Sequence, residues 1–223
     1  MSKKVETKIT IEEIRAKFIQ YTKKAFQMLP KMDTPHILDI GCGLGTLTME
    51  LARLTDGEIM GIDINKSSLD QFNKKIMIQG LSEKIKTKNC SLLYTNFSNE
   101  SFDIIWAEGV IHLFELKKVL RECNRLLKFN GFLVQHEANI WMKNNKEIYP
   151  LYGFRLVNQF SLPEKSWWTE YYIPLDKKII KLRKKYNNPE ALKVFKKYQD
   201  QIDMVRKNPK EFDSGFYIMQ KVN

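Results

Sequence analysis

Cysteine and histidine are scarce in this sequence, and their spacing argues against two large classes of site. The chain of 223 residues contains three cysteines and three histidines. Cys42, Cys90 and Cys123 are widely spaced, with no CxxC and no Cys/His pairing, so neither a zinc site nor a disulfide framework is indicated. We therefore expect reduced thiols and no metal centre.

Long apolar runs are also missing. No window approaches the roughly 18 uninterrupted apolar residues that a membrane-spanning helix needs, and the polar start Met1–Glu6 leads into no signal-like apolar segment. Apolar residues still make up 43% of the chain and aromatic residues 12%, which is enough for a buried core. We expect a cytoplasmic protein without a membrane partner.

Acidic residues are too few to balance the basic ones, and the formal net charge is +11. The excess lies at the two ends: residues 1–35 carry +4, residues 36–164 are neutral and residues 165–223 carry +7. A basic flank can attract nucleic acid, acidic lipid or an anionic substrate, or it can simply be a solvated lysine-rich helix face. The charge alone therefore assigns no function.

Short apolar runs alternate with helical patterns through the middle of the chain. Strands are predicted at 36–40, 58–64, 85–88, 102–107 and 132–135, and helices at 46–54, 67–79 and 116–127. Strands that alternate with helices of about a dozen residues are typical of a parallel sheet covered on both faces.

The two ends of the chain depart from this alternation. Thr10 and Glu13 form a capping box that predicts a helix over Ile11–Leu29. After an aromatic-rich stretch over 139–175, the pattern predicts strands at 155–162 and 215–222 and lysine-faced helices at 175–186 and 189–207. We therefore predict one α/β domain over 1–223 with a seven-stranded, mostly parallel sheet. Its parts are a cofactor-binding core at 30–138, a substrate-side cap at 139–212 and a final strand at 213–223.

The most informative motif is the glycine-rich turn that follows the first predicted strand. Gly41, Gly43 and Gly45 let the backbone bend sharply and let a ligand approach closely. Asp63 closes the second strand, where nucleotide-binding α/β folds place an acid that accepts hydrogen bonds from ribose hydroxyls. The order strand, turn, helix, strand and acid indicates an adenosine-containing ligand.

The spacing around the turn indicates which ligand this is. The third glycine comes one residue too early for a dinucleotide site, and no Gly-Lys-Ser/Thr of a P-loop follows. Asp39 directly precedes the turn, where a carboxylate repels a pyrophosphate but pairs with an ammonium group. S-adenosylmethionine combines adenosine with an amino-acid tail and carries no phosphate, so it is the cofactor that fits.

These motifs resemble those of the class I S-adenosylmethionine-dependent methyltransferases, and the resemblance covers nearly all of 30–138. Five segments match that family: Ile37–Gly45, Gly61–Asp63, Cys90–Leu92, Phe102–Leu113, and the helix and strand that follow over Leu116–Leu133. The sequence is most similar to the small-molecule group related to ubiquinone and menaquinone biosynthesis, in a subgroup without an assigned acceptor. The resemblance implies a Rossmann-like fold and methyl transfer to a small molecule.

The resemblance also implies roles for individual residues. Asp39 binds the methionine ammonium, Asp63 the ribose, and Ile64 packs on the adenine. Ser91 stands where an aspartate often holds the adenine amino group, so Ser91 or main-chain groups take that role here. The full set implied to bind the cofactor is Asp39, Gly41, Gly43, Gly45, Asp63, Ile64, Ser91 and Leu92.

Methyl transfer from a sulfonium needs in-line placement of the acceptor and, for some acceptors, removal of a proton, but no metal. Ligands of open parallel sheets bind at the carboxyl ends of the strands. Glu108 and His112 follow the fourth strand and Glu137 ends the fifth, so these three are the catalytic candidates. Each of them could equally be a capping or structural group, and His136 is a weaker candidate.

Two other functions remain open from the sequence. Methylation of RNA or protein is possible, with the basic residues of 177–185 as an electrostatic footprint. A non-catalytic cofactor-binding protein is the third possibility. The sequence favours a small-molecule acceptor over nucleic acid and leaves the oligomeric state open.

Overall fold

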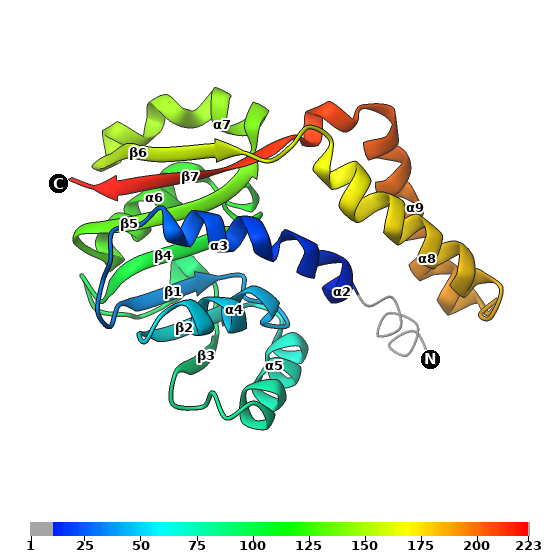
Figure 1. Ribbon diagram of the computed structural model, residues 1–223, viewed down its shortest axis with the longest axis horizontal. Helices are drawn as coiled ribbons and strands as arrows, with labels where there is room; N and C mark the ends of the chain where they lie inside the picture. Colours follow the sequence, from blue (N-terminus) through cyan, green and yellow to red (C-terminus); the bar gives the residue numbers. More distant parts are fainter. Residues whose placement is uncertain (1–10, 223) are drawn as a thin grey trace. The chain divides into compact units, whose positions relative to one another are not determined.

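The computed structural model describes residues 11–222, and these residues form two compact units (Figure 1). The larger unit, here called the sheet unit, comprises residues 19–161 and 214–222. The smaller, here called the helical unit, comprises residues 11–18 and 162–213.

The sheet unit contains one seven-stranded sheet in the order β3-β2-β1-β4-β5-β7-β6. Strands β1 to β5 are parallel, and β7 pairs antiparallel with both β5 and β6. The sequence prediction of a seven-stranded, mostly parallel sheet is thus confirmed. The strands are β1 His36–Ile40, β2 Glu58–Asp63, β3 Ile85–Asn89, β4 Phe102–Glu108, β5 Leu127–Ala138, β6 Phe154–Ser161 and β7 Ser214–Lys221.

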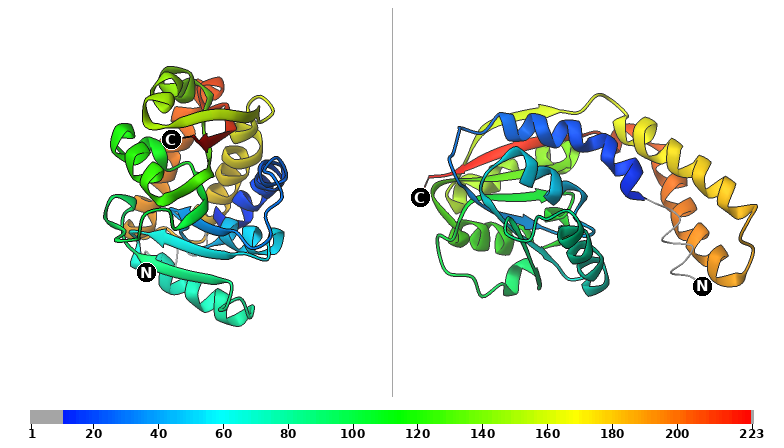
Figure 2. Two further views of the ribbon diagram at one scale, coloured as in Figure 1. Left: turned by 90° about the vertical axis from the view of Figure 1, so that its left-hand side faces the viewer. Right: turned by 60° about the horizontal axis from the view of Figure 1, so that its bottom comes forward.

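Helices cover both faces of this sheet, as the views in Figure 2 show. On one face, Trp106 of β4 lies 6.2 Å from Phe26 of α3, measured between ring centroids. On the other face, Ile105 and Leu133 join a buried cluster with side chains of α6, among them Leu120 and Cys123. The helices of the sheet unit are α3 Ile19–Gln27, α4 Thr46–Leu54, α5 Lys66–Ile78, α6 Leu116–Leu126 and α7 Asn139–Asn145, with short turns η2 Leu92–Tyr94, η3 Ile111–Leu113 and η4 Lys146–Tyr152.

The helical unit consists of α2 Ile11–Arg15, η1 Ala16–Phe18, η5 Trp167–Tyr172, α8 Ile173–Arg183, α9 Pro189–Lys207 and η6 Pro209–Phe212. Helix α9 begins where Asn188 caps it by accepting a hydrogen bond from the Ala191 amide at 3.0 Å. The Phe18 ring stacks on Trp167 at 4.6 Å, so η1 packs against η5. Lys178 of α8 forms an ion pair with Glu13 of α2 at 3.0 Å.

Several predicted boundaries differ from the structure. The helix predicted over Ile11–Leu29 is two helices separated by the 3₁₀ turn η1, and Thr10 of the predicted capping box lies outside the described residues. Strand β5 begins at Leu127 rather than 132, because Asn130 adopts a positive φ of 63° and lets the chain turn within the strand. Residues 139–161, predicted as cap, belong to the sheet unit.

No helix in the described part of the chain is both long enough and apolar enough to cross a membrane.

Candidate functional site

The glycine-rich turn leaves the carboxyl end of β1 and enters α4. Its three glycines have positive φ values, 73° at Gly41, 54° at Gly43 and 80° at Gly45. Only glycine adopts this region without a steric penalty, so the turn requires these residues. The Gly41 and Cys42 amides donate to the Ile62 carbonyl at 2.8 and 3.1 Å, which ties the turn to β2.

The three glycines differ in what a side chain would meet. A Cβ at Gly45 would lie 1.9 Å from the Phe72 ring of α5, and one at Gly41 would lie 3.1 Å from Val110. A Cβ at Gly43 would meet nothing closer than 3.9 Å. Gly45 and Gly41 are therefore needed for packing, whereas the space beside Gly43 is open to a ligand.

Asp63 at the end of β2 is held firmly against the turn. Its Oδ2 accepts a hydrogen bond from the Gly43 amide at 2.9 Å, and its Oδ1 accepts one from the Asn65 amide at 2.7 Å. Each carboxylate oxygen has further lone-pair capacity for hydroxyl donors. The next side chain, Ile64, is 76% exposed and offers an uncovered apolar surface directly beside this carboxylate.

Asp39 lies beneath the turn, where only 4% of its surface is exposed. Thr48 of α4 donates a hydrogen bond to its Oδ2 at 2.5 Å. Burial, assisted by the nearby carboxylates of Glu108 and Asp63, raises the pKa of Asp39 to about 7, although the bond from Thr48 acts in the opposite direction. A cation that approached this group would favour its ionised form.

Ser91 and Leu92 follow β3 and differ in what they can offer a ligand. The Ser91 hydroxyl makes no capping hydrogen bond to η2, and the residue is half-buried. Leu92 is buried in the core with 1% exposure, so its side chain serves packing, and only its main chain could reach a ligand.

Glu137 and His112 form a hydrogen-bonded pair at the carboxyl ends of β5 and β4. The Glu137 side chain is 2% exposed, and its Oε2 lies 2.8 Å from Nδ1 of His112. Its Oε1 accepts the amides of Ile111 at 3.0 Å and His112 at 3.4 Å. The hydrogen bond that His112 makes to the Glu137 carboxylate raises the pKa of His112, whose side chain is 41% exposed. A buried carboxylate thus orients an accessible imidazole.

Glu108 is engaged by its neighbours within the sheet unit. Its Oε1 accepts hydrogen bonds from Nε1 of Trp106 at 2.7 Å and from Oγ1 of Thr22 in α3 at 2.9 Å. Its Oε2 lies 3.7 Å from Nδ1 of His136. The second ring nitrogen of His136 is hydrogen-bonded to the Ser214 hydroxyl at 2.8 Å, so this buried histidine links β5 to β7.

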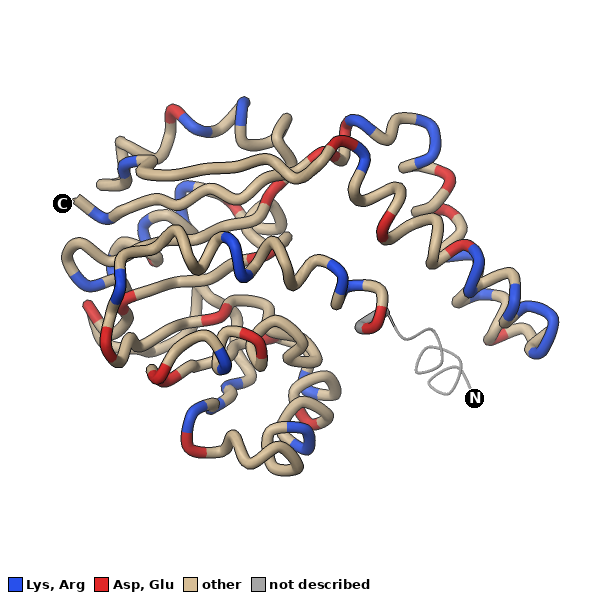
Figure 3. Tube along the Cα trace, viewed as in Figure 1, with Lys and Arg blue, Asp and Glu red and all other residues tan. Residues whose placement is uncertain are grey.

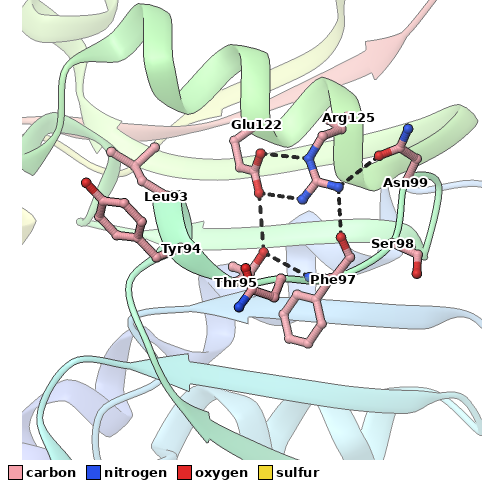
Figure 4. Close-up of a pocket in the computed structure, with 9 residues that line it drawn as sticks. Leu93, Tyr94, Thr95, Phe97, Ser98, Asn99, Glu122 and Arg125 are labelled. Atoms are coloured by element: carbon pink, nitrogen blue, oxygen red, sulfur yellow. Dashed lines mark hydrogen bonds and ion pairs between the residues drawn. The ribbon is translucent and has the colours of Figure 1, made fainter.

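A pocket of about 510 Å³ lies between the loop at 93–99 and helix α6 (Figure 4). Arg125 bonds to Glu122 through Nε and Nη2, and its Nη1 donates to the Phe97 carbonyl and to Asn99. The Arg125 carbonyl also accepts the Glu100 amide, just before β4 begins. This pocket therefore lies at the amino end of β4, opposite to Glu108, and its polar groups bind one another.

The structure thus brings together most of the residues that the sequence singles out. A hydrogen bond joins Asp63 to the glycine turn. The Val110 side chain lies where a Cβ of Gly41 would be in close contact with it, so the loop that leads to His112 runs beside the turn. Sequence reasoning missed Thr48, which donates to Asp39, and Thr22, which donates to Glu108. No motif links these threonines to the two carboxylates, and only the folded structure shows the hydrogen bonds. Among the described residues, no group of three or more His, Cys, Asp or Glu side chains could hold a metal ion.

Comparison with known proteins places this geometry in context. Residues 37–131 match the family described as "Methyltransferase domain". The demethylmenaquinone methyltransferase of Lactobacillus johnsonii is 33% identical over 114 residues, which cover 50% of this chain and 47% of that protein. The first curated relatives are matched over only 41% to 47% of their length, so the chain spans less than half of each.

Solved structures show the same fold over nearly the whole chain. The [4+2]-cyclase SpnF has a TM-score of 0.78 at 17% identity, covering 92% of this chain and 80% of that one. A protein described as a putative sarcosine dimethylglycine methyltransferase from Galdieria sulphuraria has a TM-score of 0.76 at 18% identity, covering 92% and 86%. Such low identities establish the fold and nothing more.

Proposed function

We propose that this chain, whose residues 37–131 match a methyltransferase domain, is a class I S-adenosylmethionine-dependent methyltransferase that transfers a methyl group to a small-molecule acceptor. The single observation that carries the proposal is the glycine turn, whose open residue Gly43 donates to the Asp63 carboxylate within the span of the family match.

The cofactor is S-adenosylmethionine, which supplies a methyl group on a sulfonium, and the residues present fit it. The open space at Gly43 admits its tail, the remaining lone pairs of Asp63 take the ribose hydroxyls, and the exposed Ile64 covers the adenine. The buried carboxylate of Asp39 favours an ammonium group on the far side of the turn. The Ser91 hydroxyl and the main chain of Leu92 form hydrogen bonds with the edge of the adenine ring.

His112 is the proposed general base, and Glu137 is the positioning residue that acts through it. Glu137 accepts a hydrogen bond from the protonated Nδ1 of His112. The proton therefore stays on Nδ1, and the lone pair of Nε2 is free to remove a proton from the methyl acceptor. General-base assistance of this kind contributes about 10²–10⁴-fold to a rate. Correct placement of the acceptor can lower the barrier by a further 7–11 kcal/mol or so.

Glu108 is proposed as a second positioning residue. Its bonds to Thr22 and Trp106 use one carboxylate oxygen to fix α3 against β4. Because the side chain is only 9% exposed, it suits this role better than proton transfer to a substrate.

A small-molecule acceptor is supported by the name of one relative. That relative, which is 33% identical over half of this chain, is named for demethylmenaquinone. The assignment of acceptor cover to 139–212 remains a prediction from the sequence. Three free cysteines support a reducing compartment, and we propose the cytoplasm.

The test is incubation of the protein and a methyl-labelled donor with a metabolite extract. We expect label in a small organic product and binding of S-adenosylhomocysteine by calorimetry. Asp63→Asn, which removes the charge and half of the acceptor capacity at the ribose, should weaken that binding at least tenfold. A folded protein that binds no S-adenosylhomocysteine contradicts the cofactor assignment. Binding without any labelled product contradicts methyl transfer and favours a cofactor-binding protein.

A further inference from the structure

The excess positive charge of this protein is concentrated at one place in the helical unit. Residues 177–197 contain nine Lys or Arg and a single acidic residue, Glu190. They form the second half of α8, the turn at 184–188 and the first half of α9. Figure 3 shows the basic positions gathered around this end of the helical hairpin. We call residues 177–197 the basic tip.

Ion pairing within the protein does not account for these charges. Lys178 pairs with Glu13 at 3.0 Å. The other lysines of the basic tip are exposed, and none of them forms an ion pair with another described residue. These lysines are Lys177, Lys181, Lys184, Lys185, Lys193, Lys196 and Lys197.

Helix dipoles account for only part of the pattern. Cations are favoured in the last turn of a helix, which suits Lys181 and Arg183 at the end of α8. The lysines at 193, 196 and 197 lie beyond the first turn of α9, where the effect of the helix dipole has fallen off. The dipole therefore does not account for these three positive charges.

The exposed lysines are mixed with exposed aliphatic side chains. Ile180 is 52% exposed and lies one helical turn from Lys177 and Lys184, and Leu192 is 49% exposed and lies one turn from Lys196. The described tip has no exposed aromatic residue, and only one of its nine basic residues is arginine. Single-stranded nucleic acid is held largely by aromatic stacking and arginine, whereas lysines interspersed with aliphatic residues suit a lipid surface.

We propose that the basic tip binds the surface of an anionic lipid membrane, with the lysines facing the headgroups and Ile180 and Leu192 entering the boundary region. This binding is peripheral, requires no membrane-spanning helix, and departs from the expectation of no membrane partner. Each lysine close to an anionic surface contributes about fivefold to binding, and salt screens the attraction.

The test is flotation of the full-length protein with phosphatidylcholine vesicles and with vesicles that also contain phosphatidylglycerol. We expect binding only to the anionic vesicles, weakening as salt is raised. Lys193→Gln, Lys196→Gln and Lys197→Gln together should lower the partition coefficient on the order of a hundredfold, since glutamine preserves helix propensity. The triple Lys181→Gln, Lys184→Gln and Lys185→Gln should act similarly, which guards against an effect confined to one helix.

A matched control changes the same net charge elsewhere. Lys31, Lys74 and Lys117 are exposed lysines of the sheet unit without an ion pair to a described residue, and their replacement by glutamine should alter binding at most a few-fold. Equal loss in the control and the tip variants overturns the proposal, as does equal binding to both kinds of vesicle. Binding of a single-stranded RNA that survives physiological salt and is lost in the tip variants also overturns it, in favour of nucleic acid.

Discussion

At the scale of single residues, Gly43 is where the proposed cofactor site can be tested most cleanly. Its φ of 54° is costly for any other residue, but a Cβ there meets no protein atom within 3.4 Å. Gly80 provides a matched control, because it has a φ of 64° and a Cβ added to it would meet nothing within 4 Å.

Gly43→Ala and Gly80→Ala should each lower the free energy of unfolding by about 1–2 kcal/mol, the cost of a left-handed alanine. Only Gly43→Ala should weaken binding of S-adenosylhomocysteine, at least tenfold by titration calorimetry. Equal affinities in the two variants would remove Gly43 from the ligand site.

The buried carboxyl of Asp39 predicts a pH dependence. Its pKa of about 7 lies above that of an unfolded aspartate, so the folded state favours the protonated form. The ligand-free protein should therefore lose stability as pH rises from about 4 to 7, by about 1.4 kcal/mol for each unit of pKa displacement.

An ammonium group bound near Asp39 favours the carboxylate, so cofactor binding below pH 7 should release a proton. Calorimetry of S-adenosylhomocysteine in two buffers of different ionisation enthalpy measures this release. Asp39→Asn keeps a hydrogen-bond acceptor for Thr48 but has no carboxyl proton to lose. The proton release that accompanies binding should therefore vanish in this variant. Unchanged proton release in that variant would move the ammonium away from Asp39.

The His112–Glu137 pair predicts the shape of the pH–rate profile. A base must be neutral to act, and Glu137 holds the pKa of His112 above its ordinary value of about 6.5. The pH–rate profile should therefore have a rising limb, caused by deprotonation of His112, whose midpoint lies above about pH 6.5. Glu137→Gln should shift this limb toward lower pH, and His112→Gln should abolish it and slow turnover about 10²–10⁴-fold.

His36 serves as the control for that experiment, because its exposed side chain lies at the amino end of β1. His36→Gln should leave the profile intact. A His112→Gln enzyme that keeps both its rate and its limb would show that the pair is structural.

At the scale of elements, the sequence predicts strands far better than it predicts contacts. Runs such as His36–Ile40, bounded by proline and glycine, mark buried strands without ambiguity. The 3₁₀ turn at Ala16–Phe18 carries no proline or glycine, so nothing in the pattern divides α2 from α3. The site motifs are local, and the sequence alone therefore reveals them. Thr22, which supports Glu108, lies 86 residues away from it and is brought there only by the fold.

The bond from Thr22 to Glu108 should control the attachment of α3. Thr22 is fully buried, so Thr22→Val keeps its shape but removes a buried donor, at a cost of about 1–3 kcal/mol. Amide hydrogen exchange within Ile19–Gln27 should accelerate selectively. Thr87→Val, which removes an exposed bond to Asn73, should change stability by less than about 0.5 kcal/mol. Equal exchange of α3 in both variants would show that Glu108 does not anchor it.

At the scale of the whole molecule, the two units should respond differently to the cofactor, because every proposed cofactor-binding residue belongs to the sheet unit. A ligand at a concentration one hundred times its Kd raises the free energy of unfolding of the unit that it binds by about 2.7 kcal/mol. In a protein of this size that corresponds to a rise in Tm of roughly 5–10 °C.

The four tryptophans report on the units separately. Trp106 and Trp141 lie in the sheet unit, and Trp167 and Trp168 in the helical unit. Fluorine NMR of protein labelled with 5-fluorotryptophan, recorded across the thermal transition, follows both. With S-adenosylhomocysteine, the signals of Trp106 and Trp141 should melt at the higher temperature. If the units unfold independently, those of Trp167 and Trp168 keep their midpoint, and if they unfold together all four shift equally. A shift confined to Trp167 and Trp168 would place the ligand in the helical unit, which contradicts a site built on the glycine turn.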